Sequence, residues 1–132
     1  MAEMIQFDLV SPERMLASLE VSEVEVPGAE GDFTAMADHQ SLVTTLRPGL
    51  LKAKGASDTT EYVVTGGFVE VGAAAVSVLA EQALPRAEVT RDTVEAMVAE
   101  AEAAAETAHD ELKDSAAKRV ADTKGLIELL GL

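Results

Sequence analysis

The sequence has no cysteine and no tryptophan, and it has only 2 histidines among its 132 residues. Without thiols the chain can form neither disulfides nor thiolate metal sites, which fits a reducing compartment. Aromatic residues make up only 3% of the sequence, too few to line the cleft in which paired carboxylates cleave glycosides. These scarcities argue against several kinds of catalytic centre.

Long hydrophobic runs are absent as well. No run approaches the ~18 apolar residues of a membrane-spanning helix, and the N-terminal MAEMIQFD lacks the basic and hydrophobic segments of a signal peptide. We therefore expect a soluble, cytoplasmic protein.

Positive charge is scarce too, because 10 lysines and arginines stand against 24 acidic residues and give a formal net charge of −14. Proteins bind nucleic acids, and anionic surfaces in general, mainly through Lys and Arg side chains that neutralise phosphates. We therefore expect no nucleic-acid partner and no direct binding to a membrane surface.

Up to about residue 84, apolar and polar residues alternate with the period of β-strands, in short runs broken by Gly, Pro, Asp and Ser. Ile5, Phe7 and Leu9, for example, alternate with Gln6 and Asp8. Eight to ten such strands, with no helix-length segment between them, predict an antiparallel sandwich or a flattened barrel and not a parallel sheet.

Three local features add detail to this pattern. The parity of the apolar residues shifts between Val21 and Val24, which predicts a β-bulge or a bend. The pair Gly66-Gly67 stands between two strand-like runs and predicts a two-residue hairpin. The run Ala75–Ala80 predicts the next strand.

Beyond Pro85 the pattern becomes helical, rich in Ala, Glu and Lys, with no Gly or Pro until Gly125. Asp92 and Glu95 resemble a capping box that would start the first helix. Two stripes at helical spacing follow: Val94, Met97, Val98, Ala101, Ala105 and Ala108, and then Leu112, Ala116, Val120, Thr123, Ile127 and Leu130.

A break between Thr107 and Asp110 would let the two stripes pack as a helical hairpin, whereas one unbroken helix of about forty residues would be long for a globular protein. We therefore expect an all-β domain over residues 1–85 and a C-terminal two-helix hairpin over residues 86–132. The first stripe is rich in Ala and buries little area, so each contact between the helices is weak and the hairpin could open.

No catalytic or metal-binding constellation emerges from the residues. Asp38, His39 and Ser41 are too close in sequence for a nucleophilic triad, because neighbours on an extended chain point to opposite faces. Glu30 and Asp32 could join Asp38 and His39 as metal ligands only if their loop folded tightly. The turn glycines lack the spacing of a phosphate-binding loop. We expect no catalytic residue and no metal.

Several ordered blocks of sequence carry a resemblance that spans essentially the whole chain. They are FDLVSPE at 7–13, VPGAEGDF at 26–33 followed by DH at 38–39 and LRPG at 46–49, GGFVEV at 66–71, and VSVLAEQA at 76–83. In their order and spacing, with a helical tail behind them, these blocks resemble the epsilon-subunit family of bacterial F-type ATP synthases, the counterpart of the mitochondrial delta subunit.

The resemblance implies a ten-stranded β-sandwich and a two-helix hairpin at the foot of the central stalk of the rotor. Such a subunit is not catalytic; it links the gamma subunit to the c-ring, so that proton transport through the ring is coupled to ATP synthesis. The implied location is peripheral, on the cytoplasmic face of the bacterial inner membrane, with the membrane reached only through the ATP synthase complex.

The resemblance also assigns residues to partners. Those implied to contact the c-ring are Glu30, Gly31 and Asp32. Those implied to face gamma are Ser11, His39, Gln40 and Ser41. An extended hairpin would reach the alpha and beta subunits and inhibit ATP hydrolysis, and the residues that would then meet beta are Lys113, Lys118, Arg119 and Lys124.

Some members of this family bind ATP through an I/L-D-x-x-R pattern at the start of the first helix. Here Glu95 stands in place of the Asp and Val98 in place of the Arg. Because valine cannot donate a hydrogen bond to a phosphate, no cofactor is expected. Two alternatives stay open from the residues alone: a free-standing acidic adaptor that binds one protein, and a small hydrolase that depends on His39.

Overall fold

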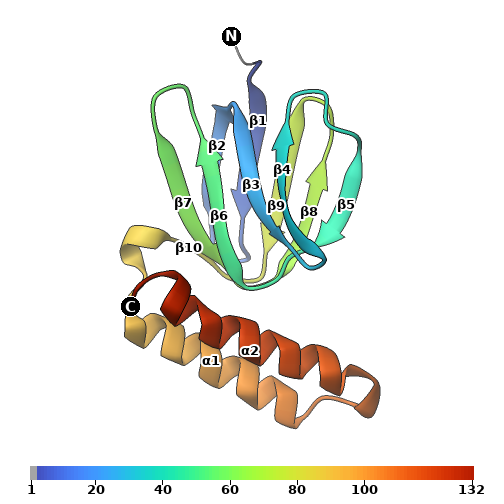
Figure 1. Cartoon of the computed structure of the whole chain (residues 1–132), viewed down its shortest axis with the longest axis vertical. Helices are drawn as coiled ribbons and strands as arrows, with labels where there is room; N and C mark the ends of the chain where they lie inside the picture. The colour runs from blue at the N-terminus through green and yellow to red at the C-terminus, as the bar shows by residue number, and fades with distance from the viewer. Residues whose placement is uncertain (1–2) are drawn as a thin grey trace. The chain divides into compact units, whose positions relative to one another are not determined.

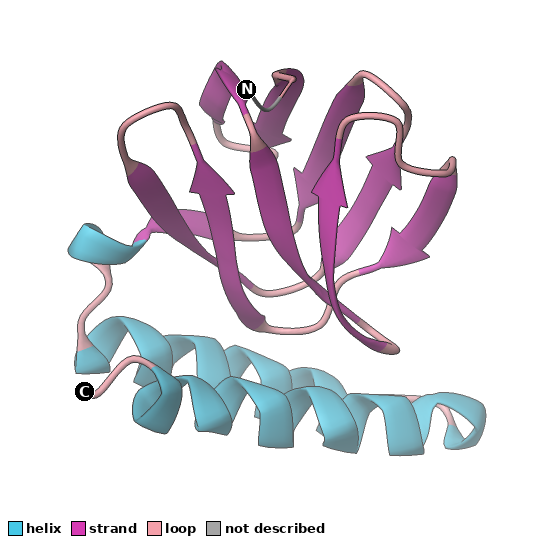
Figure 2. Cartoon of the chain, turned by 45° about the horizontal axis from the view of Figure 1, so that its top comes forward, coloured by secondary structure: helices cyan, strands magenta, loops and turns pink. Residues whose placement is uncertain are grey.

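Residues 3–132 fold into ten β-strands followed by a pair of α-helices. The computed structural model describes residues 3–132 and divides into two compact units, one ending at Ala87 and the other running from Glu88 to Leu132. Figure 2 distinguishes the strands of the first unit from the long helices of the second by colour. The predicted fold class, a β-sandwich followed by a two-helix hairpin, is confirmed.

The strands, labelled in Figure 1, are β1 (Ile5–Val10), β2 (Met15–Val21), β3 (Glu23–Gly28), β4 (Gly31–Met36), β5 (Leu42–Thr45), β6 (Gly49–Lys54), β7 (Thr59–Val64), β8 (Gly67–Val71), β9 (Ala75–Ala80) and β10 (Ala83–Pro85). They form two five-stranded sheets. Sheet A has the order β2-β1-β9-β8-β5, and sheet B has the order β10-β7-β6-β3-β4. No described strand is shared between the sheets, so the architecture is a sandwich and not a flattened barrel.

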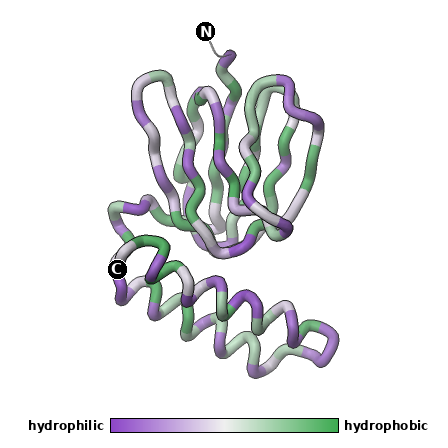
Figure 3. Tube along the Cα trace, viewed as in Figure 1, coloured by the Kyte–Doolittle hydropathy of each residue, from purple (hydrophilic) through white to green (hydrophobic). Residues whose placement is uncertain are grey.

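The core of the sandwich forms because the strands bury alternate side chains. In β1, Ile5, Phe7 and Leu9 are at most 1% exposed. Phe7 of sheet A and Tyr62 of sheet B lie with ring centroids 6.3 Å apart, so the two sheets share one core. Figure 3 shows hydrophobic and hydrophilic residues interleaved along the strands. Each large side chain enclosed in this way stabilises the fold by about 1.5–3 kcal/mol.

The shift of parity after β2 marks a passage between sheets. Ser22 separates β2 of sheet A from β3 of sheet B. Its N–H and its hydroxyl both donate to the Lys54 carbonyl oxygen, at 2.7 and 2.9 Å. Of the two alternatives predicted between Val21 and Val24, the bend is therefore correct and the bulge is not.

The predicted hairpin at Gly66-Gly67 is wrong, because β7 lies in sheet B and β8 in sheet A. The two glycines do have the positive φ values that the prediction required, 144° and 110°. The turn nevertheless carries the chain across to the other sheet. A Cβ atom on Gly67 would lie 1.9 Å from the Leu79 carbonyl oxygen, so glycine is required there.

One pair of strands departs from the expected antiparallel arrangement. β1 and β9 pair in parallel, from Gln6 opposite Ala75 to Val10 opposite Leu79. The other strand pairs are antiparallel. Most of the sandwich separates β1 from β9 along the chain, so no tight turn forces these two strands to run in opposite directions.

The second unit contains α1 (Arg91–Glu106) and α2 (Lys113–Leu129), which pack against each other. A 3₁₀ helix at Arg86–Glu88 precedes α1, and another at Asp110–Leu112 leads into α2. The break predicted between Thr107 and Asp110 is confirmed. Neither helix within residues 3–132 has the length and the apolar character that crossing a membrane requires.

The first helix starts two residues before the predicted capping box. The N-cap is Thr90, whose hydroxyl accepts from the Thr93 N–H at 3.3 Å, while the Thr93 hydroxyl accepts from the Thr90 N–H at 3.2 Å. The prediction of Asp92 and Glu95 as the box is wrong, because threonine can fill both roles of the box. Asp92 lies instead in the first turn, where a carboxylate favours the helix dipole.

The buried residues of the two helices largely follow the predicted stripes. Val94, Met97 and Ala101 are buried in α1, as the first stripe predicts. In α2 the buried residues are Thr123 and Leu126. Leu126 was not in the predicted stripe, which contained Ile127 instead; Leu126 is buried and Ile127 is only partly buried, although both lie within one turn of Thr123.

Candidate functional site

The turn between β3 and β4 carries the three residues expected to face a ring of c subunits. Gly28 pairs with Gly31 across the hairpin, leaving Ala29 and Glu30 as a two-residue turn. Gly31 has a φ of 142°, a conformation that L side chains rarely adopt. Glu30, Gly31 and Asp32 are all exposed. The structure thus gathers this predicted triplet at one tip, called here the β3–β4 tip (residues 28–32).

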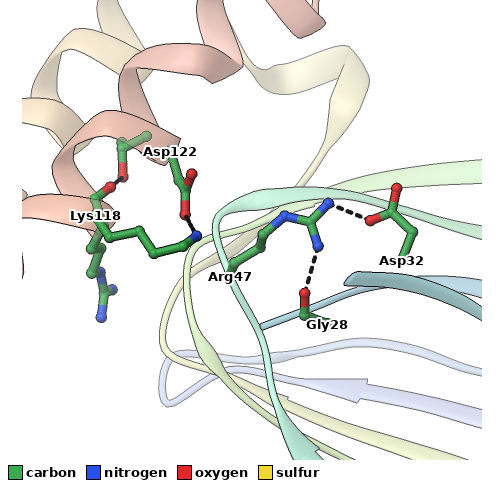
Figure 4. A network of polar contacts seen from close by, with 7 residues as sticks. Gly28, Asp32, Arg47, Lys118 and Asp122 are labelled. Carbon is green, nitrogen blue, oxygen red and sulfur yellow. Dashed lines mark hydrogen bonds and ion pairs between the residues drawn. The ribbon is translucent and has the colours of Figure 1, made fainter. Parts of the chain in front are cut away.

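An arginine from a later segment holds this tip, and sequence reasoning gave it no role. The two terminal nitrogens of Arg47 donate to the carboxylate of Asp32 and to the carbonyl oxygen of Gly28 (Figure 4). The Asp32 side chain is 75% exposed, whereas that of Arg47 is only 28% exposed. The single signal in the sequence was that Arg47 belongs to the LRPG block.

Backbone contacts reinforce this attachment. The Ala29 N–H donates to the Thr45 carbonyl at 2.9 Å, and the Arg47 N–H donates to the Pro27 carbonyl at 3.0 Å. Gly28 and Leu46 form an isolated antiparallel bridge between these two bonds. The connection from β5 to β6 is therefore joined to the tip by main-chain bonds as well as by the Arg47 side chain.

Three of the four residues expected to face gamma lie at the far end of β4. His39, Gln40 and Ser41 follow β4 in the turn to β5. Asp38 has a φ of 64° and its N–H donates to the Ala73 carbonyl at 2.8 Å, which fixes this turn. Figure 1 shows β4 running between the β3–β4 tip and this turn.

Ser11 is not brought together with His39. It follows β1, whose last residue Val10 pairs with Leu79 of β9. Leu79 is opposite Phe68, and Phe68 is opposite Thr45, the last residue of β5. Because residues 39–41 precede β5, Ser11 and the His39 turn lie at opposite ends of sheet A.

Nothing in the described geometry assembles a hydrolytic or metal site around His39. Its Nδ1 lies 2.6 Å from the carbonyl oxygen of Gln40, so this ring nitrogen faces the backbone. Its ring is 6.3 Å from that of Phe33, centroid to centroid. Within residues 3–132, no group of three or more acidic or histidine side chains is placed to hold a metal ion.

An apolar row crosses the outer face of sheet A and was also missed from the sequence. The strand registers place Thr45, Phe68, Leu79, Val10 and Met15 side by side across all five strands. Met15 is 61% exposed, Phe68 54% and Leu79 53%. The signal was present, since Phe68 and Leu79 occupy the outward parity of strands whose inward residues are already apolar.

A shallow groove runs along this apolar row. It encloses about 250 Å³, and its lining includes Val10, Ser11, Phe68 and Leu79. The next row of the same face is polar, with Asp8 opposite Ser77 and Ser77 opposite Glu70. Hydrogen bonds from Gln6 and Ser18 lower the pKa of Asp8, which favours the charged form of this carboxylate. The groove is thus an apolar strip beside acidic residues.

The three lysines of the second unit lie beside acids of the same unit. Lys118 lies 2.7 Å from Asp122 (Figure 4), and Lys113 lies 3.3 Å from Asp110. Lys124 of α2 reaches Glu102 of α1 at 3.8 Å. Arg119 also has a partner. Any external partner of the three lysines would have to compete with acids already in place.

Comparisons with known proteins agree with this architecture. Residues 4–86 match the family model described as "ATP synthase, Delta/Epsilon chain, beta-sandwich domain". The chain is 52% identical over 126 residues to the ATP synthase epsilon chain of Rhodobacter capsulatus, covering 96% of each. It is equally 52% identical over 118 residues to that of Jannaschia sp. (strain CCS1), covering 89% of each.

A similar fold occurs in a chain of the Euglena gracilis mitochondrial ATP synthase, in a cryo-EM structure of the OSCP/F1/c-ring assembly. The TM-score is 0.72 at 21% identity, and the match covers 96% of this chain and 81% of that one. At this identity the likeness supports the fold.

Proposed function

The chain belongs to the delta/epsilon-chain family of ATP synthase, and from that premise we propose that it is the non-catalytic central-stalk subunit of a proton-translocating F-type enzyme. Its task is to link the gamma subunit to the c-ring, so that proton transport drives ATP synthesis. The observation that carries this proposal is the β3–β4 tip, which is exposed, acidic and held by Arg47 and backbone bonds.

The tip and the apolar row are joined physically, which suits a part that transmits force. The Ala29 N–H of the tip bonds to the carbonyl of Thr45, and Thr45 is also the β5 end of the apolar row. The tip meets the c-ring through Glu30, Gly31 and Asp32, and the groove beside Ser11 receives gamma. Rotation of the ring would exert a force on the tip, and β5 would transmit this force to sheet A.

Gamma contact extends along β5 to the turn that holds His39, Gln40 and Ser41. An apolar strip beside Asp8 and Glu70 selects a partner whose apolar side chains are bordered by basic ones. Through these two partners the protein is held peripherally at the cytoplasmic face of the bacterial inner membrane.

The groove assignment is tested by binding of the purified subunit to purified gamma. Phe68→Glu should weaken binding at least tenfold, because it places a charge in the apolar strip while Phe68 contributes little to the core. Thr60→Glu is the matched control, since it adds the same charge at an exposed position of sheet B. Equal affinities of both variants and the wild type would remove the groove from the gamma interface.

The hairpin regulates the enzyme by extending toward the alpha and beta subunits of the catalytic head. Lys113, Lys118 and Lys124 would then exchange their present acidic partners for acids of beta, and Arg119 would meet beta beside them. The test is to remove residues 88–132 and measure ATP hydrolysis by the assembled enzyme. Faster hydrolysis supports inhibition by the hairpin, and an unchanged rate contradicts it.

No nucleotide controls this hairpin. Val98 cannot donate to a phosphate, and Arg91, the nearest alternative donor, is 3.2 Å from Glu95. The isolated subunit should therefore bind Mg-ATP no more tightly than about millimolar, which corresponds to about −4 kcal/mol. Titration calorimetry measures this, and a micromolar site that disappears in Arg91→Ala would contradict it.

A further inference from the structure

We infer that Arg47 is the residue that positions the β3–β4 tip, that Asp32 serves as its internal anchor, and that Glu30 is the acid presented to the partner. This inference rests on the proposed contact between the tip and the c-ring. The two carboxylates of the tip then have different roles: Asp32 holds the tip in place, and Glu30 is available to bind the partner.

Arg47 is hydrogen-bonded to both strands of the tip, β3 and β4. Gly28 is the last residue of β3 and Asp32 is the second residue of β4, and one guanidinium donates to both. The backbone N–H of Arg47 adds a third attachment, to Pro27. A planar guanidinium can serve two acceptors at once, and a lysine ammonium in its place is a single point charge on a flexible stem.

The side chain of Glu30 is left for a partner. Glu30 occupies the exposed turn itself, and it makes no hydrogen bond or ion pair through its side chain with residues 3–132. The charge of Asp32 is balanced by Arg47, so the unbalanced negative charge of the tip is that of Glu30. The partner is therefore a polar loop that offers a cation or hydrogen-bond donors to one carboxylate.

The roles of Asp32 and Arg47 are separated by exchanging their charges in the assembled enzyme. Arg47→Asp and Asp32→Arg, each alone, place like charges together and should lower proton pumping per ATP hydrolysed at least threefold. The double variant restores an opposite pair and should recover pumping to within about twofold of wild type. If Asp32 bound the ring directly, the double variant would stay as impaired as Asp32→Arg, and the inference would be overturned.

A second measurement does not depend on the enzyme. The Ala29 amide, bonded to Thr45, reports directly on attachment of the tip. In the isolated subunit, Arg47→Gln should speed hydrogen exchange of this amide at least tenfold, and Arg47→Lys should speed it less. The amide of Val24, a buried residue of β3, serves as the control for global loosening. Unchanged exchange at Ala29, or an equal rise at Val24, would overturn the positioning role.

Glu30→Gln separates this inference from the proposed function on which it rests. It should lower pumping per ATP without changing exchange at Ala29, and charge exchange at 32 and 47 should not rescue it. If Glu30→Gln and both single charge variants leave pumping unchanged, the c-ring contact itself is wrong. If Glu30→Gln lowers pumping but the double variant is not restored, the contact stands and the role assigned to Arg47 is overturned.

Discussion

The sandwich and the hairpin are stabilised in different ways. The sandwich encloses large side chains such as Phe7, Leu9 and Leu51 completely, and strands distant in sequence supply them. The hairpin buries fewer residues, among them Val94, Met97 and Leu126. Its helices depend more on local propensity, on the Thr90 cap and on short-range ion pairs. We therefore expect the first unit to be stable on its own and the second to be only marginally stable.

Separating the two units should give the largest effect. A chain ending at Ala87 should keep a cooperative thermal transition and a native near-ultraviolet circular dichroism spectrum. Residues 88–132 alone should be only partly helical, because two short helices with a small core are marginal in water. Far-ultraviolet circular dichroism against temperature measures this. A sharp thermal transition in the isolated hairpin would contradict its expected marginal stability. The absence of such a transition in the isolated sandwich would contradict its expected independent stability.

Removal of one core ring should come next in size. Phe7→Ala should lower the free energy of unfolding by about 3–5 kcal/mol, because the ring is fully enclosed between the two sheets. Phe68→Ala removes the same ring from the outer face and should cost less than about 1 kcal/mol. Urea unfolding of both variants measures the difference. Similar losses would show that Phe68 is part of a stabilising cluster.

Glycine-to-alanine substitutions should have opposite signs in the two units. Gly67→Ala should destabilise the sandwich by more than about 2 kcal/mol, because its φ is 110° and the new methyl would meet the Leu79 carbonyl. Gly125→Ala should raise helix stability by about 0.5–1 kcal/mol, because Gly125 lies inside α2 with open space at its Cβ position. Thermal melting of each variant measures the change in stability. If both substitutions stabilise, or both destabilise, the expected difference between the two glycines is wrong.

The smallest expected effect is a pH dependence confined to the sandwich. Burial raises the pKa of Tyr62, so the folded state favours the protonated phenol. Its contribution to stability is complete below the unfolded pKa of about 10 and is lost as pH rises through the folded pKa. Between about pH 9 and pH 11, wild type should therefore lose more stability than Tyr62→Phe, by less than about 1 kcal/mol after solvent screening. Parallel curves from urea titrations would show that the phenol ionises alike in both states.

Much of the fold could be predicted because the alternation of apolar and polar residues is visible within each short segment of sequence. The alternation of Ile5, Phe7 and Leu9 and the run Ala75–Ala80 both correspond to strands in the structure. What failed was strand pairing. Gly66-Gly67 has the backbone angles of a hairpin turn, yet nothing within a few residues specifies whether the next strand pairs with the last or joins the opposite sheet.

The candidate site was predictable only in part, for a related reason. Glu30, Gly31 and Asp32 stand together in the sequence, and the structure places them on one tip. The pairing of Asp32 with Arg47 joins residues 15 positions apart, through a connection whose path depends on the packing of both sheets. The apolar row depends likewise on register, because its five residues come from five strands.

The parallel pairing of β1 with β9 also determines when the sandwich can fold during synthesis on the ribosome. Synthesis delivers β1 first, but its second neighbour in sheet A does not exist until Ala75–Ala80 has been translated. Until then β1, which carries Phe7, lacks its neighbour β9 in sheet A. The pairing of β1 with β9 is also opposed by the entropy lost in closing the long loop between them. The sandwich therefore completes its fold late in translation, while the helical segment that follows needs only contacts near in sequence.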